Sequence, residues 1–376
     1  MTGTQLRTED FDYHLPEELI AQEPMMPRDA CRLLVMNRDT SQLDHRHFRD
    51  IGDYLEPGDL LVVNETRVLP ARLQGRRADT GGAVEVLLLK ELDKATNTWE
   101  CLVKPGKRVR EGAIIEFADS AVDSIGVALE KQDEGRSKSL QPASLLTGVV
   151  EAVDEGGIRR ISFTAADNDF HAVIHQLGTL PLPPYIKDYA GDQSMYQTVY
   201  ASTDEHSAAA PTAGLHFTPE LLEQLQSRGI NVARVRLDVG LDTFRPVSED
   251  DPAQHHIHTE YFHVSQQAAD AVNATRAAGG RVVAVGTTVV RALESAAQLS
   301  ADSFLSEQGA PTSLYILPGF DFQVVDALIT NFHVPKSTLV MMISAFTGRE
   351  EILAAYKEAV HKEYRFLSFG DAMLIL

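Results

Sequence analysis

The sequence predicts an α/β protein, with a layered α/β main domain and an inserted small β-barrel, and three observations lead to this fold class. Short strands separated by turn residues occupy the chain from Leu60 to about Phe163, as in small barrels. After Phe163, helical patterns alternate with apolar strands, as in layered sheets. At 376 residues, the chain exceeds what one hydrophobic core usually serves. We therefore expect a discontinuous catalytic domain, 1–65 and 158–376, around a barrel domain, 66–157.

Capping residues and stop signals place the elements of the α/β domain. Thr218 can cap a helix that runs to Gly229 and precedes the strand INVARVRL, because a threonine hydroxyl accepts the free N–H groups of a first turn. Ser265 can cap a second helix, which precedes the strand RVVAVG. A third helix is expected to start near Ser337, after the strand ALITNFH, and an amphipathic helix, EEILAAYKEAVHKEY, follows. The helix-strand stretch 11–37 is expected to join this domain.

The strands of the barrel region are predicted from short apolar segments between turn residues. Examples are DLLVVN, AVEVLLL, WECLVKP and AIIEF, separated by Gly, Pro and charged pairs. Residues 119–144 are instead rich in Ser, Asp, Glu and Gln. That composition predicts a mobile hairpin or loop excursion, to which we assign no function.

Composition excludes several classes of protein. Hydrophobic residues at 44% and charged residues at 23% are ordinary globular values, and no stretch approaches the roughly 18 apolar residues of a membrane span. The first residues lack the basic and apolar regions of an export signal, so we expect a cytoplasmic protein with no membrane partner. Cys31 and Cys101 are the only cysteines, and without metal-ligand spacing they predict neither a disulfide framework nor a zinc site.

A local basic cluster contrasts with the formal net charge of −20. Between Thr66 and Arg110, ten Lys or Arg residues stand against five acidic ones, so this window carries +5. Phosphate binding needs local cations, and the window therefore permits a nucleic-acid partner. A solvated face would have the same composition, so charge alone leaves both interpretations open.

Two loops of the α/β domain have residues suited to a ligand site. In open α/β sheets the ligand binds beyond the carboxyl ends of the strands, and VVAVG runs there into Gly286, Thr287 and Thr288. The glycine allows close approach of the backbone, while the N–H groups of the helix start suit a carboxylate or a ribose hydroxyl. The second loop, residues 207–218, is a run of small side chains, SAAAPTAGLHFT, that includes His216.

In the second loop, Pro211, Thr212, Ala213 and Gly214 would shape a pocket wall, with His216 at its rim as a general acid or base near neutral pH. Structural alternatives exist for both loops. The glycine turn could be an ordinary capped turn, and the small-residue run could be a connector with its histidine packed in the core.

Other polar residues occur at or near the ends of apolar strands: Asn64, Thr66, Arg67, Asn331, His333, His258 and Glu260. Each could instead satisfy backbone groups, a common role for Asn and His at strand ends. The histidines around position 258 lack the helical i, i+4 pairing and the fixed acidic partner of a metal site, so no metal is expected.

Taken together, these segments resemble the tRNA ribosyltransferase-isomerase family of queuosine synthesis. The pattern is visible in PRDACRLLVMNR, PGDLLVVNETRVLPARL, LPLPPYI, APTAGLHFT, GGRVVAVGTTVVRALES and YRFLSFGDAMLI, in the family's order, from FDYHLPEELIAQ almost to the C-terminus. Asp238 replaces the histidine of the family pattern and Leu241-Asp242 replaces a small pair. The excursion 119–144 is also longer than the family usually has.

The resemblance implies a reaction on tRNA that carries 7-aminomethyl-7-deazaguanine at the wobble position. S-adenosylmethionine would be the ribosyl donor, with no other cofactor and no metal, and the products would be epoxyqueuosine-tRNA, adenine and methionine. A sulfonium acidifies the adjacent C5′ hydrogens, so the chemistry needs a positioned base, help for the leaving adenine and access for the free amine. We expect the enzyme to be a monomer.

The resemblance also suggests roles for the candidate residues. His216 is the first candidate for proton transfer, followed by His333 and His258 with Glu260. The expected substrate-binding residues are Pro211, Thr212, Ala213, Gly214, Phe217, Tyr196, Tyr200, Gly286, Thr287, Thr288, Arg291 and Asn331. Among them, Thr287, Thr288 and Arg291 would hold the methionyl or ribose part. Tyr196, Tyr200 and Phe217 would stack on adenine or the modified base.

Contacts with tRNA are expected at Asn64, Thr66, Arg67, Arg72 and Lys104, the last three with phosphates. Two other functions compete with this interpretation. An S-adenosylmethionine-dependent RNA methyltransferase would release S-adenosylhomocysteine, and a non-catalytic RNA-binding module would form no donor-dependent product. The polar loops at three strand ends disfavour the binding module.

Overall fold

The structure, a computed structural model, describes residues 6–118, 144–187, 189–240, 246–300 and 304–376. Its contacts divide the chain into two compact units, Met1–Arg67 with Leu182–Leu376 (unit 1) and Val68–Pro181 (unit 2). The expected barrel limits, 66–157, differ from this division at the second boundary because a further strand and a helix belong to unit 2. Leu241-Asp242 and residues 119–143 of the predicted excursion lie outside the described residues.

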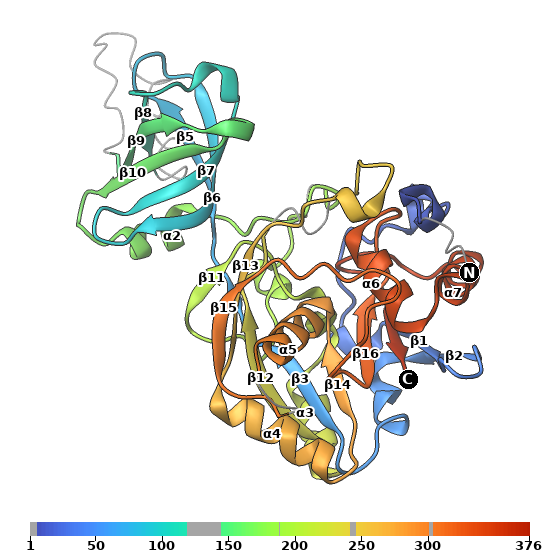
Figure 1. Ribbon diagram of the computed structural model, residues 1–376. Coiled ribbons are helices and arrows are strands. Elements are labelled where there is room, and N and C mark those ends of the chain that lie inside the picture. Colours follow the sequence, from blue (N-terminus) through green and yellow to red (C-terminus); the bar gives the residue numbers. More distant parts are fainter. Residues whose placement is uncertain (1–5, 119–143, 188, 241–245, 301–303) are drawn as a thin grey trace. The chain divides into compact units, whose positions relative to one another are not determined.

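Unit 1 is built on a nine-stranded mixed sheet (Figure 1). Its order is β15 (Gln308–Thr312), β13 (Glu260–Val264), β12 (Asn231–Leu237), β3 (Leu60–Asn64), β14 (Val282–Val285), β16 (Ala327–Asn331), β17 (Ala372–Ile375), β1 (Arg32–Met36) and β2 (Leu43–His47). The four central strands, β12, β3, β14 and β16, run parallel. Loops that follow these four strands therefore meet at one edge of the sheet.

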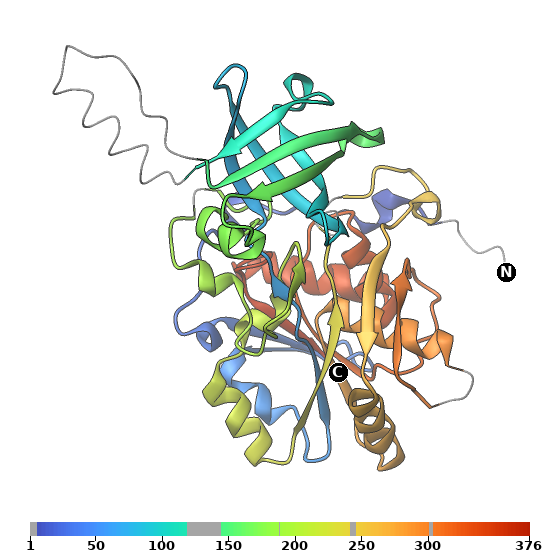
Figure 2. The ribbon, with the colours of Figure 1, turned by 90° about the vertical axis from the view of Figure 1, so that its left-hand side faces the viewer.

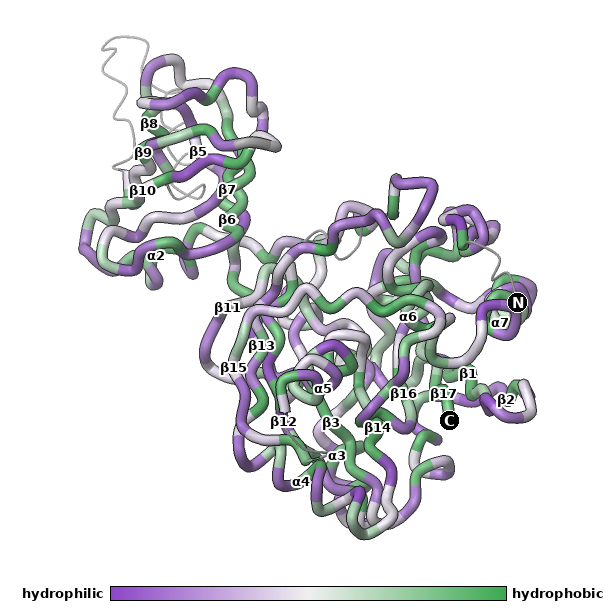
Figure 3. Tube along the Cα trace, viewed as in Figure 1, coloured by the Kyte–Doolittle hydropathy of each residue, from purple (hydrophilic) through white to green (hydrophobic). Residues whose placement is uncertain are grey.

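Alternating side chains of β3 enter two different hydrophobic cores. Leu60 and Val62 join the core under α4 (Gln266–Ala277), α5 (Thr287–Leu299), α6 (Thr338–Thr347) and α7 (Arg349–His361). Leu61 and Val63 join the core under α3 (Pro219–Ser227) and the short helix η4 (Phe48–Asp53). Figure 2 shows α3 and α4 on opposite sides of the sheet, and Figure 3 shows β3 and β14 as predominantly hydrophobic. A strand covered on both faces needs apolar residues throughout.

The predicted helix caps are confirmed. The Thr218 hydroxyl accepts the N–H of Leu221 at 3.1 Å, and the Ser265 hydroxyl accepts the N–H of Ala268 at 3.3 Å. Ser337 caps α6 in the same way. Helix α5 differs, because its N-cap is Gly286, with φ of 94° and no side chain to accept the first N–H groups.

The N-terminal stretch contributes a strand but no long helix. β1 enters the sheet between β17 and β2. The residues before it form only short 3-10 turns, η1 (Thr8–Phe11), η2 (Glu17–Leu19) and η3 (Arg28–Ala30). Pro16, Pro24 and Pro27 interrupt this region, and proline removes the N–H that a continuing helix needs.

Unit 2 is a closed barrel of six strands, as predicted. They are β5 (Arg72–Arg77), β6 (Ala83–Asp93), β7 (Thr98–Lys104), β8 (Ile114–Phe117), β9 (Leu146–Val153) and β10 (Arg159–Ala165). β10 closes the barrel by pairing with both β7 and β9. The helix α2 (Phe170–Leu177) packs against the barrel through Phe170, whose ring centroid lies 5.4 Å from that of Phe163 on β10. The predicted barrel segment DLLVVN is instead β3, because all five residues of that strand are buried in the sheet of unit 1.

Asn64 fastens the carboxyl end of β3 to its neighbours. Its Nδ2 donates to the Leu237 carbonyl at 2.9 Å and to Thr288 Oγ1 at 3.3 Å. Its Oδ1 accepts the N–H groups of Leu237 and Thr66, each at 3.1 Å. The amide is fully buried, so all its hydrogen-bonding capacity is spent inside the protein.

Asn64→Ala should destabilise unit 1 by about 2–4 kcal/mol, because it leaves several buried backbone groups without partners. Hydrogen exchange of the β3 and β12 amides is the appropriate measurement, since the single tryptophan, Trp99, lies in unit 2. Asn231→Ala, an exposed change on β12, is the matched control. Equal protection of these amides against hydrogen exchange in the two variants would contradict the stabilising role of the Asn64 hydrogen bonds.

Candidate active site

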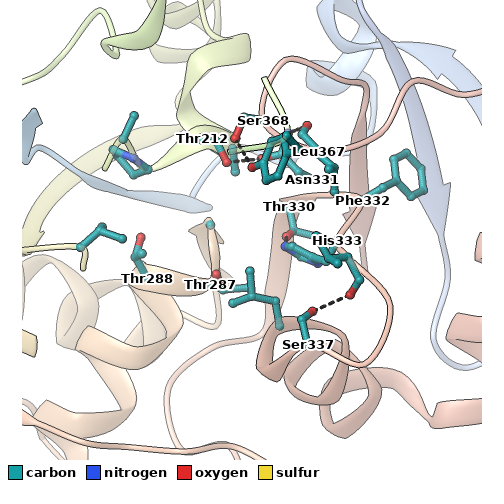
Figure 4. A pocket seen from close by; sticks show the side chains of 18 residues that line it. Thr212, Thr287, Thr288, Thr330, Asn331, Phe332, His333, Ser337, Leu367 and Ser368 are labelled. Atoms are coloured by element: carbon teal, nitrogen blue, oxygen red, sulfur yellow. Dashed lines mark hydrogen bonds between the residues drawn. The ribbon is translucent and has the colours of Figure 1, made fainter. Parts of the chain in front are cut away.

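A pocket of about 570 Å³ lies beyond the carboxyl ends of the parallel strands of unit 1 (Figure 4). The loops after β12, β14 and β16 supply most of its wall, together with the small-residue run and the segment before β17. Its lining residues are Tyr185, Ala210, Pro211, Thr212, Ala213, Val239, Gly286, Thr287, Thr288, Thr330, Asn331, Phe332, His333, Val334, Ser337, Leu339, Leu367 and Ser368.

Eight of the predicted site residues are brought together in this pocket: Pro211, Thr212, Ala213, Gly286, Thr287, Thr288, Asn331 and His333. The polar groups that the described residues present are hydroxyls, one carboxamide, one phenol and one imidazole, and none is Asp, Glu, Lys or Arg. The pocket wall therefore combines apolar side chains with neutral polar groups and carries no fixed charge.

Helix α5 presents its first turn to the pocket. Figure 4 shows Thr287 and Thr288 across the pocket from Thr330 and His333. Within the described part of the chain, the N–H groups of Thr287 and Thr288 have no hydrogen-bond acceptor. Gly286 is necessary here because its positive φ disfavours residues with a Cβ. A ligand oxygen could therefore accept these N–H groups at the positive end of the helix.

A chain of hydrogen bonds runs from the pocket into the core through Asn331. Thr212 Oγ1 donates to Asn331 Oδ1 at 2.8 Å. Asn331 Nδ2 donates to the Leu367 carbonyl at 3.3 Å and lies 2.9 Å from His216 Nε2. A carbonyl can only accept, so the donor end of the amide faces Leu367 and His216 Nε2 must be the unprotonated nitrogen. His216 Nδ1, 3.2 Å from Cys31 Sγ, then carries the proton.

His216 thus lies behind the pocket wall rather than at the rim, where the sequence had placed it. Its side chain is 4% exposed and lines a separate hollow of about 250 Å³ with Cys31. Burial lowers the pKa of the imidazole to about 3, with smaller contributions from Arg365 and Arg28. The neutral His216 lies 2.9 Å from the Asn331 amide nitrogen and does not line the main pocket.

His333 is the histidine that lines the pocket. Its Nε2 is 3.2 Å from Thr330 Oγ1, and its Nδ1 is 3.3 Å from the Tyr356 hydroxyl. Burial lowers the pKa of this imidazole to about 3 as well. His333 is therefore neutral at physiological pH, and its hydrogen bonds fix the direction of the Thr330 hydroxyl.

The predicted stacking residues lie in the core. Tyr196 and Phe217 are fully buried and Tyr200 is nearly so. Phe217 packs against Phe48 with ring centroids 4.9 Å apart. A Cβ on Gly214 would lie 2.0 Å from the Tyr200 hydroxyl, so this glycine is required for packing. These residues support the wall from behind and do not line the pocket.

Glu260 and Arg291 form a buried ion pair with side chains 6% and 5% exposed. Glu260 Oε1 also accepts the N–H of Gly240 at 2.7 Å. Arg291 lines a hollow next to the main pocket, whereas His258 is exposed in the segment before β13. The structure therefore does not bring His258 and Glu260 together with His333 as pocket-lining residues.

The predicted tRNA contacts are in different environments. Asn64 and Thr66 are buried and satisfied internally, so they present no surface to a phosphate. Arg67 Nε donates to the Ser202 carbonyl, and Arg72 pairs with Glu85 at 2.8 Å. Lys104 is exposed on the barrel.

Several exposed cations of the barrel and several pocket residues were not among the predicted site residues, although the cations belong to the basic window 66–110. Around the exposed Lys104, the side chains of Lys107, Arg108 and Arg110 are also exposed. In the pocket, Tyr185, Thr330, Ser337, Leu367 and Ser368 were not predicted. Leu367 and Ser368 lie in the segment YRFLSFGDAMLI, one of those that carry the family resemblance. Leu367 adopts φ of 69°, an unfavourable conformation for a residue with a Cβ.

Asp238, where the family pattern has histidine, ties the loop after β12 to the loop after β3. Its Oδ1 accepts the Thr66 hydroxyl at 3.3 Å and lies 3.5 Å from Arg236 Nε.

Among the described residues, no group of three or more His, Cys, Asp or Glu is arranged to hold a metal. Within the same residues, no helix combines the length and apolar character needed to cross a membrane.

The fold and the pocket define a two-unit α/β protein with a small-molecule site beyond its parallel strands. The family model for the queuosine biosynthesis protein matches residues 8–375, and the chain belongs to that family. This confirms the family inferred from the sequence.

The sequence similarity to individual relatives extends over almost the whole chain. It is 51% identical to the S-adenosylmethionine:tRNA ribosyltransferase-isomerase of Symbiobacterium thermophilum and 50% identical to that of Moorella thermoacetica, over 99% of this chain and all of each relative. Among solved structures, it resembles the S-adenosylmethionine tRNA ribosyltransferase from Thermotoga maritima. The sequence identity is 38% and the TM-score 0.53, over 98% of this chain and 100% of that one.

The His216 imidazole should remain neutral, with its proton on Nδ1, from pH 8 down to about pH 5, because its folded pKa is far below the unfolded value of about 6.5. Below about pH 6.5, His216 is protonated in the unfolded chain but not in the folded one. This residue therefore lowers the free energy of unfolding as the pH drops below about 6.5. Nitrogen-15 NMR of histidine-labelled protein, assigned with His216→Gln, measures this. The same protein unfolded in urea is the control, and an imidazolium signal from folded His216 at pH 6 would contradict the assignment.

Proposed function

We propose that the chain transfers and isomerises the ribosyl group of S-adenosylmethionine onto 7-aminomethyl-7-deazaguanine at the wobble position of tRNA. The products are epoxyqueuosine-tRNA, adenine and methionine. Support comes from the full-length similarity to relatives named for this activity. The structural observation that carries the proposal is the uncharged pocket, lined by apolar and neutral polar groups, beside the open first turn of α5.

An uncharged pocket suits a sulfonium substrate. The positive sulfur makes the neighbouring C5′ hydrogens acidic, and a carboxylate beside it would stabilise that charge and reduce the acidity. The described wall instead offers neutral hydroxyls and the N–H groups of Thr287 and Thr288. Such groups can hold ribose hydroxyls and adenine without neutralising the sulfonium.

Proton transfer is assigned to the side of the pocket where Thr330 and His333 lie. Thr330 and His333 both line the pocket, and Thr330 Oγ1 lies 3.2 Å from His333 Nε2. We assign His216 a positioning role, because it reaches the pocket only through Asn331. Glu260 and His258 are assigned no part in proton transfer.

The tRNA surface is proposed to include the exposed cations of the barrel near η5 (Gly106–Arg108). Lys104, Lys107, Arg108 and Arg110 are exposed there, and within the described residues none forms an ion pair. Cations without an ion pair can bind RNA phosphates directly and displace the counterions condensed there. Arg72 would first have to break its ion pair with Glu85. We further propose that the protein is a cytoplasmic monomer.

Incubation with S-adenosylmethionine and precursor tRNA should release one adenine and one methionine for each modified base. Asn331→Ala should slow adenine release about a hundredfold by disordering the Thr212 wall. Chromatography of the small molecules and mass analysis of the nucleosides are the measurements, with Asn231→Ala as control. Formation of S-adenosylhomocysteine instead of adenine would replace this proposal with a methyltransferase.

Lys104→Gln with Lys107→Gln should weaken tRNA binding and reduce the slope of log affinity against log salt by about 1.5, as expected for two lost phosphate contacts. Lys90→Gln with Lys94→Gln removes the same charge from the exposed β6 end of the barrel and should leave the slope nearly unchanged. Filter binding at several salt concentrations measures both. Equal slopes in the two double variants would place the RNA surface elsewhere.

A further inference from the structure

A second hollow, of about 350 Å³, adjoins the main pocket and shares Thr287, Thr288 and Leu339 with it. The rest of its wall is mostly apolar and comes from the segment 314–316 and helix α6. These residues are Ile257, Leu314, Tyr315, Ile316, Thr338 and Met342, together with Arg291. The hollow is therefore an apolar extension of the pocket that contains a single cation.

Arg291 is held rigidly, one turn after Thr287 on α5. Its Nε donates to the Leu314 carbonyl at 3.1 Å, and its Nη1 donates to Glu260 Oε2. Glu260 is itself fixed by the N–H of Gly240. The third guanidinium nitrogen, Nη2, is buried and has no hydrogen-bond partner.

An unpartnered, buried guanidinium nitrogen is costly, because it has lost its water without gaining an acceptor. Arg291 lines the hollow, and a ligand oxygen that reaches Nη2 there would supply the acceptor that this nitrogen lacks. A carboxylate is the best acceptor for arginine, because the hydrogen bond is then charge-assisted.

We propose that the second hollow binds the methionyl arm of S-adenosylmethionine, with the arm's carboxylate accepting from Arg291 Nη2. The inference rests on the proposed function and extends it to the half of the donor that leaves as methionine. The apolar wall suits the methylene groups of the arm. Thr287 and Thr288, shared by the two spaces, mark where the sulfonium joins adenosyl and methionyl parts.

This arrangement gives Arg291 a binding role and Glu260 a positioning role. The pair keeps its charges balanced when the hollow is empty, and the carboxylate adds a third acceptor to a guanidinium that is already oriented by the Leu314 carbonyl and Glu260. The enzyme would then distinguish the complete donor from nucleosides that lack the amino-acid carboxylate.

The first test varies the ligand and leaves the protein unchanged. Isothermal titration should show that decarboxylated S-adenosylmethionine binds about ten- to a hundredfold more weakly than S-adenosylmethionine, the range expected for one charge-assisted hydrogen bond. L-methionine should likewise bind better than L-methioninol, which has an alcohol in place of the carboxylate. Equal affinities within each pair would overturn the proposal.

The second test removes the pair. Glu260→Gln with Arg291→Gln replaces it by two neutral amides, which avoids leaving one charge buried alone, and should bring the affinity ratio of the two donors close to one. Asp59→Asn with Arg281→Gln is the matched control. This Arg–carboxylate pair, at 2.6 Å, lies at the amino ends of β3 and β14, whereas the pocket lies beyond their carboxyl ends. The control should keep the ratio, and a collapse in both variants would contradict a local role for Arg291.

The binding assays need no tRNA, so they separate this inference from the proposed function. Adenine release without any preference for the carboxylate would overturn the subsite and leave the function standing. A carboxylate preference that depends on Arg291 would support the subsite even if no adenine were released. If the amide variant failed to fold, the ligand comparison on the unmodified protein would still decide the matter.

Discussion

The Asn331 carboxamide joins three segments at the edge of the sheet, and the geometry of the pocket depends on it. It accepts from Thr212 on the small-residue run, donates to Leu367 before β17, and faces His216 in the core. Its orientation follows from the Leu367 carbonyl, and that orientation in turn sets the tautomer of His216. A single amide thus contributes to the shape of one wall and sets the tautomer of the histidine behind it.

Charge is excluded from the main pocket wall and kept in defined places around it. The Glu260–Arg291 pair is buried beside the adjoining hollow, while Asp238 is engaged by Thr66 and Arg236. In unit 2, by contrast, exposed cations stand without ion pairs among the described residues near η5. This division gives one chain two chemically different surfaces, a neutral pocket wall in unit 1 and a cationic patch on unit 2.

Local signals in the sequence predicted most of the fold. The caps Thr218 and Ser265, the apolar strands and the closed barrel are set by residues close together in the chain, and the structure bears them out. Pocket residues such as Thr287 and Asn331 were also predictable, because ligands bind beyond the ends of parallel strands.

What the sequence could not reveal depends on contacts between distant segments. The burial of His216 requires Cys31 and Asn331 to meet it from either side, and the pairing of Glu260 with Arg291 joins a strand to a helix. Asn64 looks like an exposed strand-end residue until its partners on β12 are known. A polar side chain has the same sequence signature whether it faces solvent or a buried backbone group.

The position of β17 has a consequence for biosynthesis. This strand lies between β16 and β1, although β1 is made near the beginning of the chain and β17 near its end. Until β17 is synthesised, the β1–β2 hairpin has no strand that joins it to the central sheet. Its apolar residues therefore stay exposed to solvent on the nascent polypeptide. The barrel, whose strands are contiguous within Val68–Pro181, has no such delay, so vectorial folding would complete the inserted unit long before the sheet that surrounds it in sequence.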